Sequence, residues 1–150
     1  MTIELTYGES IDIKAPIDAV YQYRLDFVKL AVYNSNVTNI RRTKDGEDTL
    51  GTGAEYVFDL TLPGWDPMQA FLNVTATDKP NSITTDTGTE AMSGREVNTF
   101  ELTPDGAIHF TITFSISLPD EAKDGLDWIE QSGRDQYKIE LAAIKKTLEA

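Results

Sequence analysis

The feature that most constrains the fold is a series of short segments in the middle of the chain where apolar and polar side chains alternate. In residues 107–118, aromatic and aliphatic side chains take the even positions, and histidine, threonine and serine take most of the odd ones. This period of two predicts strands with one buried and one exposed face. Short turn clusters separate the segments, so we expect an antiparallel meander. The predicted strands are 37–43, 54–62, 69–78, 82–90, 95–103 and 107–118.

The two ends of the chain complete an α+β plan. Residues 2–14 also alternate and predict a first strand, and Pro16 follows it at a position that suits the first turn of a helix. Residues 20–31 fit one or two short helices. An apolar stripe at helical spacing predicts a long helix over residues 120–149, continuous or broken at Ser132-Gly133. Because a curved sheet of about seven strands must bury its concave face, we expect this helix to cover it.

Composition and charge limit the classes of function. The chain has 150 residues, enough for one domain, and no cysteine, which excludes disulfides, thiolate metal sites and cysteine nucleophiles. Its 25 acidic and 13 basic residues give a net charge of −12, which disfavours nucleic acid as a partner. The start MTIELTYGES lacks the marks of an export signal, and no segment is apolar enough to cross a bilayer. We therefore expect a cytoplasmic protein without integral membrane association.

Side chains with an obvious chemical role are scarce. His109 is the only histidine, and its position in the alternation predicts an exposed side chain on the polar face of the strand. The sequence contains no serine-hydrolase elbow and no spacing typical of zinc or calcium ligands. We expect neither a metal nor another cofactor.

Four loose motifs resemble the helix-grip superfamily, which includes START domains, plant Bet v 1-like proteins and bacterial polyketide cyclase/dehydrase-like proteins. They are IDIKAPIDAVY at 11–21, GTGAEY at 51–56, FEL at 100–102 before the Asp105-Gly106 turn, and IKKTLE at 144–149. Together they span essentially the whole chain. The resemblance implies a single helix-grip domain with a cavity between the C-terminal helix and the concave sheet.

If such a cavity exists, the alternation and the helical stripe nominate its wall. The candidate ligand-binding residues are Val28, Val32, Tyr33, Tyr56, Phe58, Trp65, Asn98, Phe100, Phe110, Ile112, Phe114, Ile129, Gly133 and Tyr137. Plain core packing is the competing interpretation for each of them. Arg95 and Tyr137 are the candidate catalytic residues, because they could polarise a carbonyl or move a proton. Trp65, in the proline-rich turn LPGWDPM at 62–68, could fold over the cavity as a lid, with Trp128 beside it.

These observations leave three functions open. The first is binding of a hydrophobic or aromatic small molecule, lipid-like or polyketide-like. The second, implied by the resemblance, is a polyketide aromatase/cyclase or dehydrase, against which the lack of an obvious acid–base pair counts. The third is a protein-interaction role like that of the co-chaperone branch, which a collapsed interior would favour. A protein partner or a homodimer also stays open.

Overall fold

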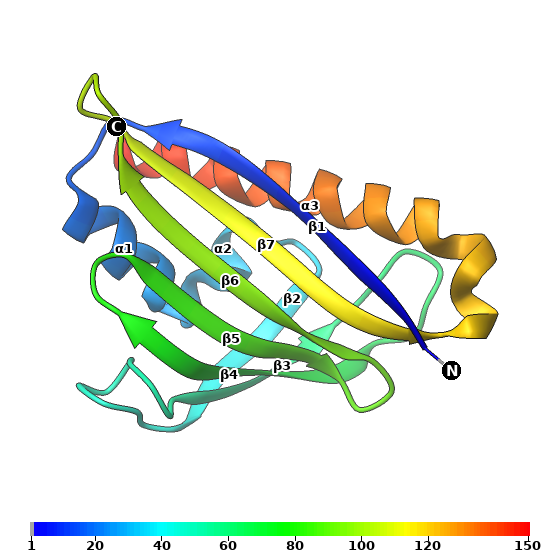
Figure 1. Cartoon of the computed structure of the whole chain (residues 1–150). Helices are drawn as coiled ribbons and strands as arrows, with labels where there is room; N and C mark the ends of the chain where they lie inside the picture. The colour runs from blue at the N-terminus through cyan, green and yellow to red at the C-terminus, as the bar shows by residue number, and fades with distance from the viewer. Residues whose placement is uncertain (1) are drawn as a thin grey trace.

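Seven antiparallel strands form one curved sheet in the computed structural model, which describes residues 2–150 (Figure 1). The order across the sheet is β1-β7-β6-β5-β4-β3-β2, so β2 to β7 form the predicted meander and β1 pairs with the last strand. The strands are β1 Thr2–Ile13, β2 Val37–Lys44, β3 Glu55–Leu60, β4 Met68–Asp78, β5 Ser82–Thr89, β6 Ser93–Leu102 and β7 Ile108–Pro119.

The helices lie at two places in the chain. Between β1 and β2 come α1 (Ile17–Leu25), the short 3-10 helix η1 (Phe27–Lys29) and α2 (Leu30–Tyr33). After β7, residues Asp120–Gly125 form the 3-10 helix η2, and α3 runs from Leu126 to Leu148. The long α-helix therefore begins later than predicted. It is continuous through Gly133, which settles the question of a break at that position.

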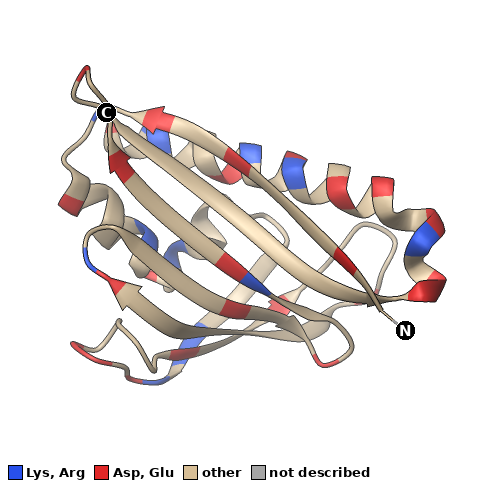
Figure 2. Ribbon diagram, in the orientation of Figure 1, with Lys and Arg blue, Asp and Glu red and all other residues tan. Residues whose placement is uncertain are grey.

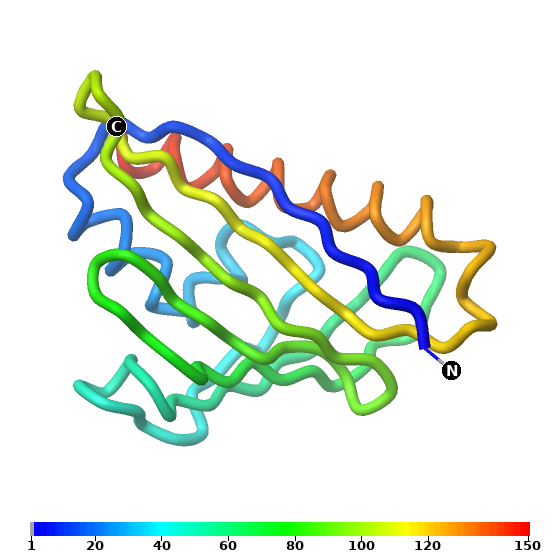
Figure 3. Tube along the Cα trace, viewed as in Figure 1, coloured from blue at the N-terminus to red at the C-terminus, as the bar shows by residue number. Residues whose placement is uncertain are grey.

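The long helix α3 runs along β1 over the concave side of the sheet, and Figure 3 shows the chain returning toward the end of β1. The backbone amide of Lys14 donates a hydrogen bond of 2.7 Å to the Glu149 carboxylate. This bond joins the end of β1 to the end of α3. These features confirm the predicted helix-grip fold.

Aromatic packing fills the space between helix and sheet near α1. The rings of Phe100 and Phe110 stack with centroids 4.7 Å apart, and Tyr21 meets Phe100 edge-on at 5.5 Å. Leu141 and Ile144 of α3 are fully buried in the same core. We call this region the packed end.

Gly133 has a packing reason to lie on the buried side of α3. A Cβ atom at this position would overlap the phenol of Tyr7. The Tyr7 ring is itself held between Phe114 and Tyr137, with ring centroids at 5.8 and 6.0 Å. The space that glycine leaves open is therefore occupied by a tyrosine of β1.

Charged residues lie mostly on the outside. Figure 2 shows both acidic and basic positions along α3 and acidic ones on the turns. His109 is half-exposed on the outer face of the sheet, as its alternation predicts, and its Nδ1 lies 2.7 Å from Asp12. Within residues 2–150, no helix is both long and apolar enough to cross a bilayer.

Candidate functional site

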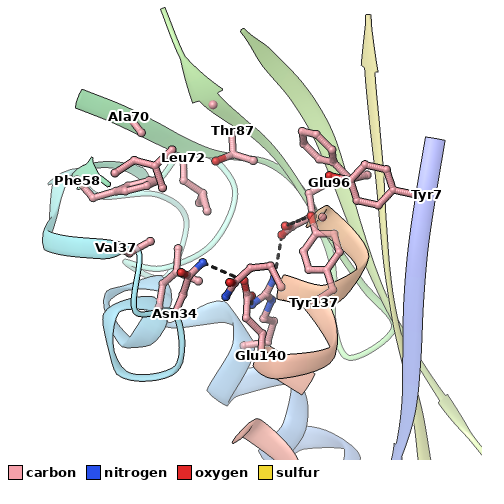
Figure 4. A pocket seen from close by; sticks show the side chains of 17 residues that line it. Tyr7, Asn34, Val37, Phe58, Ala70, Leu72, Thr87, Glu96, Tyr137 and Glu140 are labelled. Atoms are coloured by element: carbon pink, nitrogen blue, oxygen red, sulfur yellow. Dashed lines mark hydrogen bonds and ion pairs between the residues drawn. The ribbon is translucent and has the colours of Figure 1, made fainter. Parts of the chain in front are cut away.

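A cavity of about 240 Å³ lies between the middle of α3, the short helices and the concave face of the sheet. Residues from α1, α2, α3 and all seven strands line it, and Figure 4 shows their side chains turned toward a common space. We call this region the hollow end. The structure therefore contains the space that the family resemblance implies.

One wall of the cavity is apolar. It is formed by the end of β3, the start of β4, the start of β2 and the last short helix. Its members are Leu30, Val37, Phe58, Leu60, Ala70 and Leu72. Ala70 is the smallest side chain in this group, and it is 2 % exposed. A wall of this kind favours apolar or aromatic ligand groups.

The opposite wall centres on Arg24, a fully buried arginine of α1. Its guanidinium forms ion pairs with two buried carboxylates, Glu96 of β6 at 3.0 Å and Glu140 of α3 at 3.2 Å. Charged groups are almost never fully buried unless they are paired, and here one cation serves two acids. The three side chains come from α1, β6 and α3, so their ion pairs bridge the sheet to both helices.

Four polar neighbours complete this arrangement, which we call the buried polar cluster. Arg24 donates from Nε to Asn98 at 2.8 Å and from Nη1 to Tyr33 at 3.1 Å. The Asn34 amide donates to Glu140 at 3.0 Å, and the Tyr137 hydroxyl donates to Glu96 at 2.9 Å. The buried polar cluster thus consists of Arg24, Tyr33, Asn34, Glu96, Asn98, Tyr137 and Glu140.

Burial changes the acid–base behaviour of this cluster. Loss of solvation raises the pKa of Glu140 from its usual 4.5 to about 7, although Arg24 pulls it down and Glu96 adds to the rise. Burial opposes the charge on Arg24, but Tyr33, Glu96 and Glu140 outweigh it and raise its pKa. Burial also raises the pKa of Tyr33 to about 12. Glu140 therefore takes up and releases its proton near neutral pH.

Several predicted residues meet at this site. Phe58, Phe114, Gly133 and Tyr137 line the cavity. Tyr33 and Asn98 belong to the buried polar cluster behind it, where they hold Arg24 in place. Their contact with a ligand remains a prediction.

Other predicted residues lie elsewhere. Four of them are buried in the core without lining the cavity: Tyr56, Phe100, Phe110 and Ile112. Ile129 is partly buried and packs against the core. Val28 and Val32 point outward, with exposures of 40 % and 76 %. The short helices turn these valines away from the sheet because Leu30 and Tyr33 occupy the inner side.

Trp65 is 63 % exposed and Trp128 is 67 % exposed, so neither covers the cavity in this structure. Trp65 lies in the β3–β4 turn, as predicted. Its role as a lid stays a prediction.

Arg95 does not reach the cavity. Glu96, Asn98 and Phe100 share the concave face of β6, so the strand alternation turns Arg95 to the convex face. There it pairs with Asp86 at 3.1 Å and is 61 % exposed. The prediction that Arg95 is a catalytic residue inside the cavity is therefore wrong, and Arg24 is the arginine at the cavity wall.

Arg24, Glu96 and Glu140 were not nominated from the sequence, although periodicity carried a signal for each. Glu96 has the same parity as Asn98, Arg24 follows Val20 and Tyr21 at helical spacing, and Glu140 lies on the apolar stripe of α3. A charged residue on a predicted buried face was the available signal. No group of three or more histidine, aspartate or glutamate side chains among residues 2–150 is arranged to hold a metal ion.

Comparisons with known proteins agree with this architecture. A family model described as polyketide cyclase / dehydrase and lipid transport matches residues 5–149. No curated protein sequence matches the chain. Solved structures match it in fold at low sequence identity.

The di-domain aromatase/cyclase StfQ of the steffimycin biosynthetic pathway superposes with a TM-score of 0.81 at 11% identity, over 97% of this chain and 51% of that one, so the chain spans about half of StfQ. Norcoclaurine synthase of Thalictrum flavum gives 0.77 at 11% identity, over 99% of this chain and 96% of that one. The ZhuI aromatase/cyclase of Streptomyces sp. R1128 gives 0.76 at 10% identity, over 98% and 94%.

Proposed function

Since this chain belongs to the polyketide cyclase / dehydrase and lipid transport family, we propose that its cavity binds a hydrophobic or aromatic small molecule, lipid-like or polyketide-like. The observation that carries the proposal is the hollow end itself, a space of about 240 Å³ with one apolar wall. Burying about 200 Å² of apolar ligand surface there contributes about 5 kcal/mol to binding. The polar wall opposite fixes the orientation of the ligand.

A binding screen tests this proposal. Fatty acids, sterols, quinones and polyketides are added to the protein while its melting temperature and tryptophan fluorescence are followed. A ligand at about 100 times its Kd stabilises the folded state by about 2.7 kcal/mol, which is readily seen as a higher Tm. If none of these compounds changes either signal, the proposed function is wrong.

A matched pair of substitutions in β4 locates the binding. Ala70→Leu adds volume inside the cavity, whereas Ala76→Leu makes the same change at an exposed position of the same strand. We expect Ala70→Leu to lose the ligand-induced rise in Tm and Ala76→Leu to keep it. Equal rises in both variants would place the ligand outside the cavity.

Catalysis as an aromatase/cyclase or dehydrase is the second candidate, and one observation favours it. Glu140 lies at the cavity wall, and its pKa of about 7 suits a group that takes up and releases a proton near neutral pH. Glu140 therefore replaces Arg95 as the candidate for proton transfer. Turnover of a polyketide chain that falls in Glu140→Gln and persists in Arg95→Gln supports catalysis, and unchanged turnover in Glu140→Gln removes it from the mechanism. The co-chaperone-like alternative, which a collapsed interior would favour, gains no support from a hollow one.

A further inference from the structure

We propose that the cavity selects a ligand that carries an ammonium group on an apolar body, with Glu96 and Glu140 as the receiving carboxylates, and that it rejects ligands with a carboxylate head. This inference rests on the proposed binding function and names the chemical class of the ligand. It follows from the balance of charges and hydrogen bonds along the polar wall.

The polar wall carries more acid than base. Among the described residues that line the cavity, the charged ones are Arg24, Glu96 and Glu140, two carboxylates against one guanidinium. With both carboxylates ionised, the wall has one uncompensated negative charge in a region of low solvent access. Such a charge attracts a cation far more strongly than it would in water.

Arg24 has little left to offer an anionic ligand. Four of its five N–H groups are taken, since Nε donates to Asn98, Nη1 to Tyr33 and Glu140, and Nη2 to Glu96. Aromatic rings also lie close to the guanidinium. Its central carbon lies 5.4, 5.9 and 6.0 Å from the ring centroids of Phe27, Tyr33 and Phe110. A ligand carboxylate would therefore meet Glu96 and Glu140 without a cation to neutralise it.

The carboxylates, in contrast, keep capacity to accept. An ionised carboxylate offers about four acceptor positions. Glu140 accepts one hydrogen bond on each oxygen, from Arg24 and from Asn34. Glu96 accepts two on Oε1 and one on Oε2, the latter from Tyr137. Donors of an ammonium group fit the positions that remain.

The surroundings of Glu140 give the binding a pH dependence. Arg24 of α1, Tyr33 of α2 and Glu96 of β6 face it from other elements, and Tyr137 precedes it on α3. Of these groups, Tyr33 and Tyr137 have raised pKa values and stay neutral, while the pKa of Glu140 is about 7. A bound ammonium favours the ionised form of Glu140. Its binding therefore weakens as the pH falls through about 7.

The test compares three probes of the same length: octylamine, octanol and octanoate. Their dissociation constants are measured by calorimetry at about pH 8 and about 0.15 M salt, where exposed charges are screened beyond about 8 Å. We expect octylamine to bind at least about tenfold more tightly than octanoate, with octanol between them. We also expect octylamine to bind several-fold more weakly at about pH 6.

A substitution pair separates the cavity from the acidic surface, which by itself attracts cations. Glu140→Gln removes the uncompensated charge and keeps the shape of the side chain. Glu101→Gln makes the same chemical change at an exposed position of β6. We expect Glu140→Gln to lower the preference for octylamine over octanol and Glu101→Gln to leave it unchanged. Circular dichroism confirms that both variants are folded.

The outcomes distinguish this inference from the proposed function. If octanol binds and octanoate binds as tightly as octylamine, the proposed binding function stands and the ammonium selectivity is overturned. If the preference for octylamine survives in Glu140→Gln and Glu96→Gln, the assignment to these carboxylates is overturned. If none of the three probes binds, the proposed binding function is overturned, and the inference is overturned with it.

Discussion

The packed end and the hollow end share the same helix and the same sheet but differ in what fills the space between them. At the packed end, Phe100 stacks on Phe110 and meets Tyr21 edge-on, and Ile144 is fully buried in the same core. At the hollow end, the apolar wall and the buried polar cluster border a cavity of about 240 Å³. The concave face itself differs between the ends, because β6 carries Glu96 at the hollow end and Phe100 at the packed end, and β5 carries Thr87 at the cavity and Ile83 away from it.

The buried polar cluster explains how the cavity is kept open in a small domain. Buried polar groups must be satisfied, and the buried polar cluster satisfies its members mainly with one another. Ion pairs and hydrogen bonds that join α1, β6 and α3 fix their spacing, so apolar side chains cannot close the gap without breaking them.

Removal of Arg24 tests the hollow end most severely. Arg24→Met leaves Glu96 and Glu140 buried without a cation, and we expect it to lower the free energy of unfolding by about 3–5 kcal/mol. Arg95→Met, the control, breaks an exposed pair and should cost less than about 1 kcal/mol. Urea unfolding followed by circular dichroism measures both values. A similar loss in the two variants would mean that the buried polar cluster does not set the spacing of the elements.

Truncation of one phenylalanine at each end compares their packing directly. Phe100→Ala opens a new void in a filled core and should cost about 3–4 kcal/mol. Phe58→Ala enlarges a space that already exists, so we expect about half that loss. The same urea unfolding measurement applies to both. The distinction between the ends disappears if Phe58→Ala proves as costly as Phe100→Ala.

The pH dependence of stability tests the raised pKa of Glu140. A carboxyl whose pKa is 4.5 when unfolded and about 7 when folded binds its proton more tightly in the folded state. Its contribution to stability is therefore present below about pH 4.5 and is lost as the pH rises to about 7, by on the order of 2–3 kcal/mol. Glu140→Gln should flatten this part of the stability profile, whereas Glu101→Gln should not. An unchanged slope in Glu140→Gln would show that Glu140 titrates normally.

The smallest predicted effect concerns Gly133, at the border of the cavity. Gly133→Ala improves helix propensity by about 1 kcal/mol but forces its methyl group into the Tyr7 ring. We expect a net loss of about 1–2 kcal/mol, since overpacking outweighs propensity. Ser132→Ala, the exposed neighbour, should not destabilise the protein. The Gly133→Ala loss should shrink when Tyr7 is also changed to Leu, and an equal loss in both backgrounds would exclude the clash as its cause.

The sequence predicted the fold because its signals are local. The period of two in the strands and the stripe of α3 each depend on neighbours a few residues apart, and seven strands with a long C-terminal helix follow from them. Errors lie where local patterns end. The apolar stripe predicts a long helix from residue 120, whereas residues 120–125 form a 3-10 helix.

The candidate site was predicted only in part. Tyr137 and Asn98 were found because they lie on buried faces and carry polar atoms. Arg95 was placed inside although its parity is opposite to that of Asn98, so a consistent use of the alternation would have replaced it by Glu96. Local periodicity can place a charged residue on an inner face, but it does not indicate which charges meet.

The amino-acid sequence by itself determined the strands, the helices and the face that each side chain occupies, since these depend on short-range backbone geometry. Only the tertiary structure brought Arg24, Glu96 and Glu140 within hydrogen-bonding distance, because they are separated by 72 and 116 positions along the chain and meet where α1, β6 and α3 cross. The same crossing left Gly133 beside Tyr7 and a cavity next to both. The chemical character of the cavity therefore depends on how the elements pack.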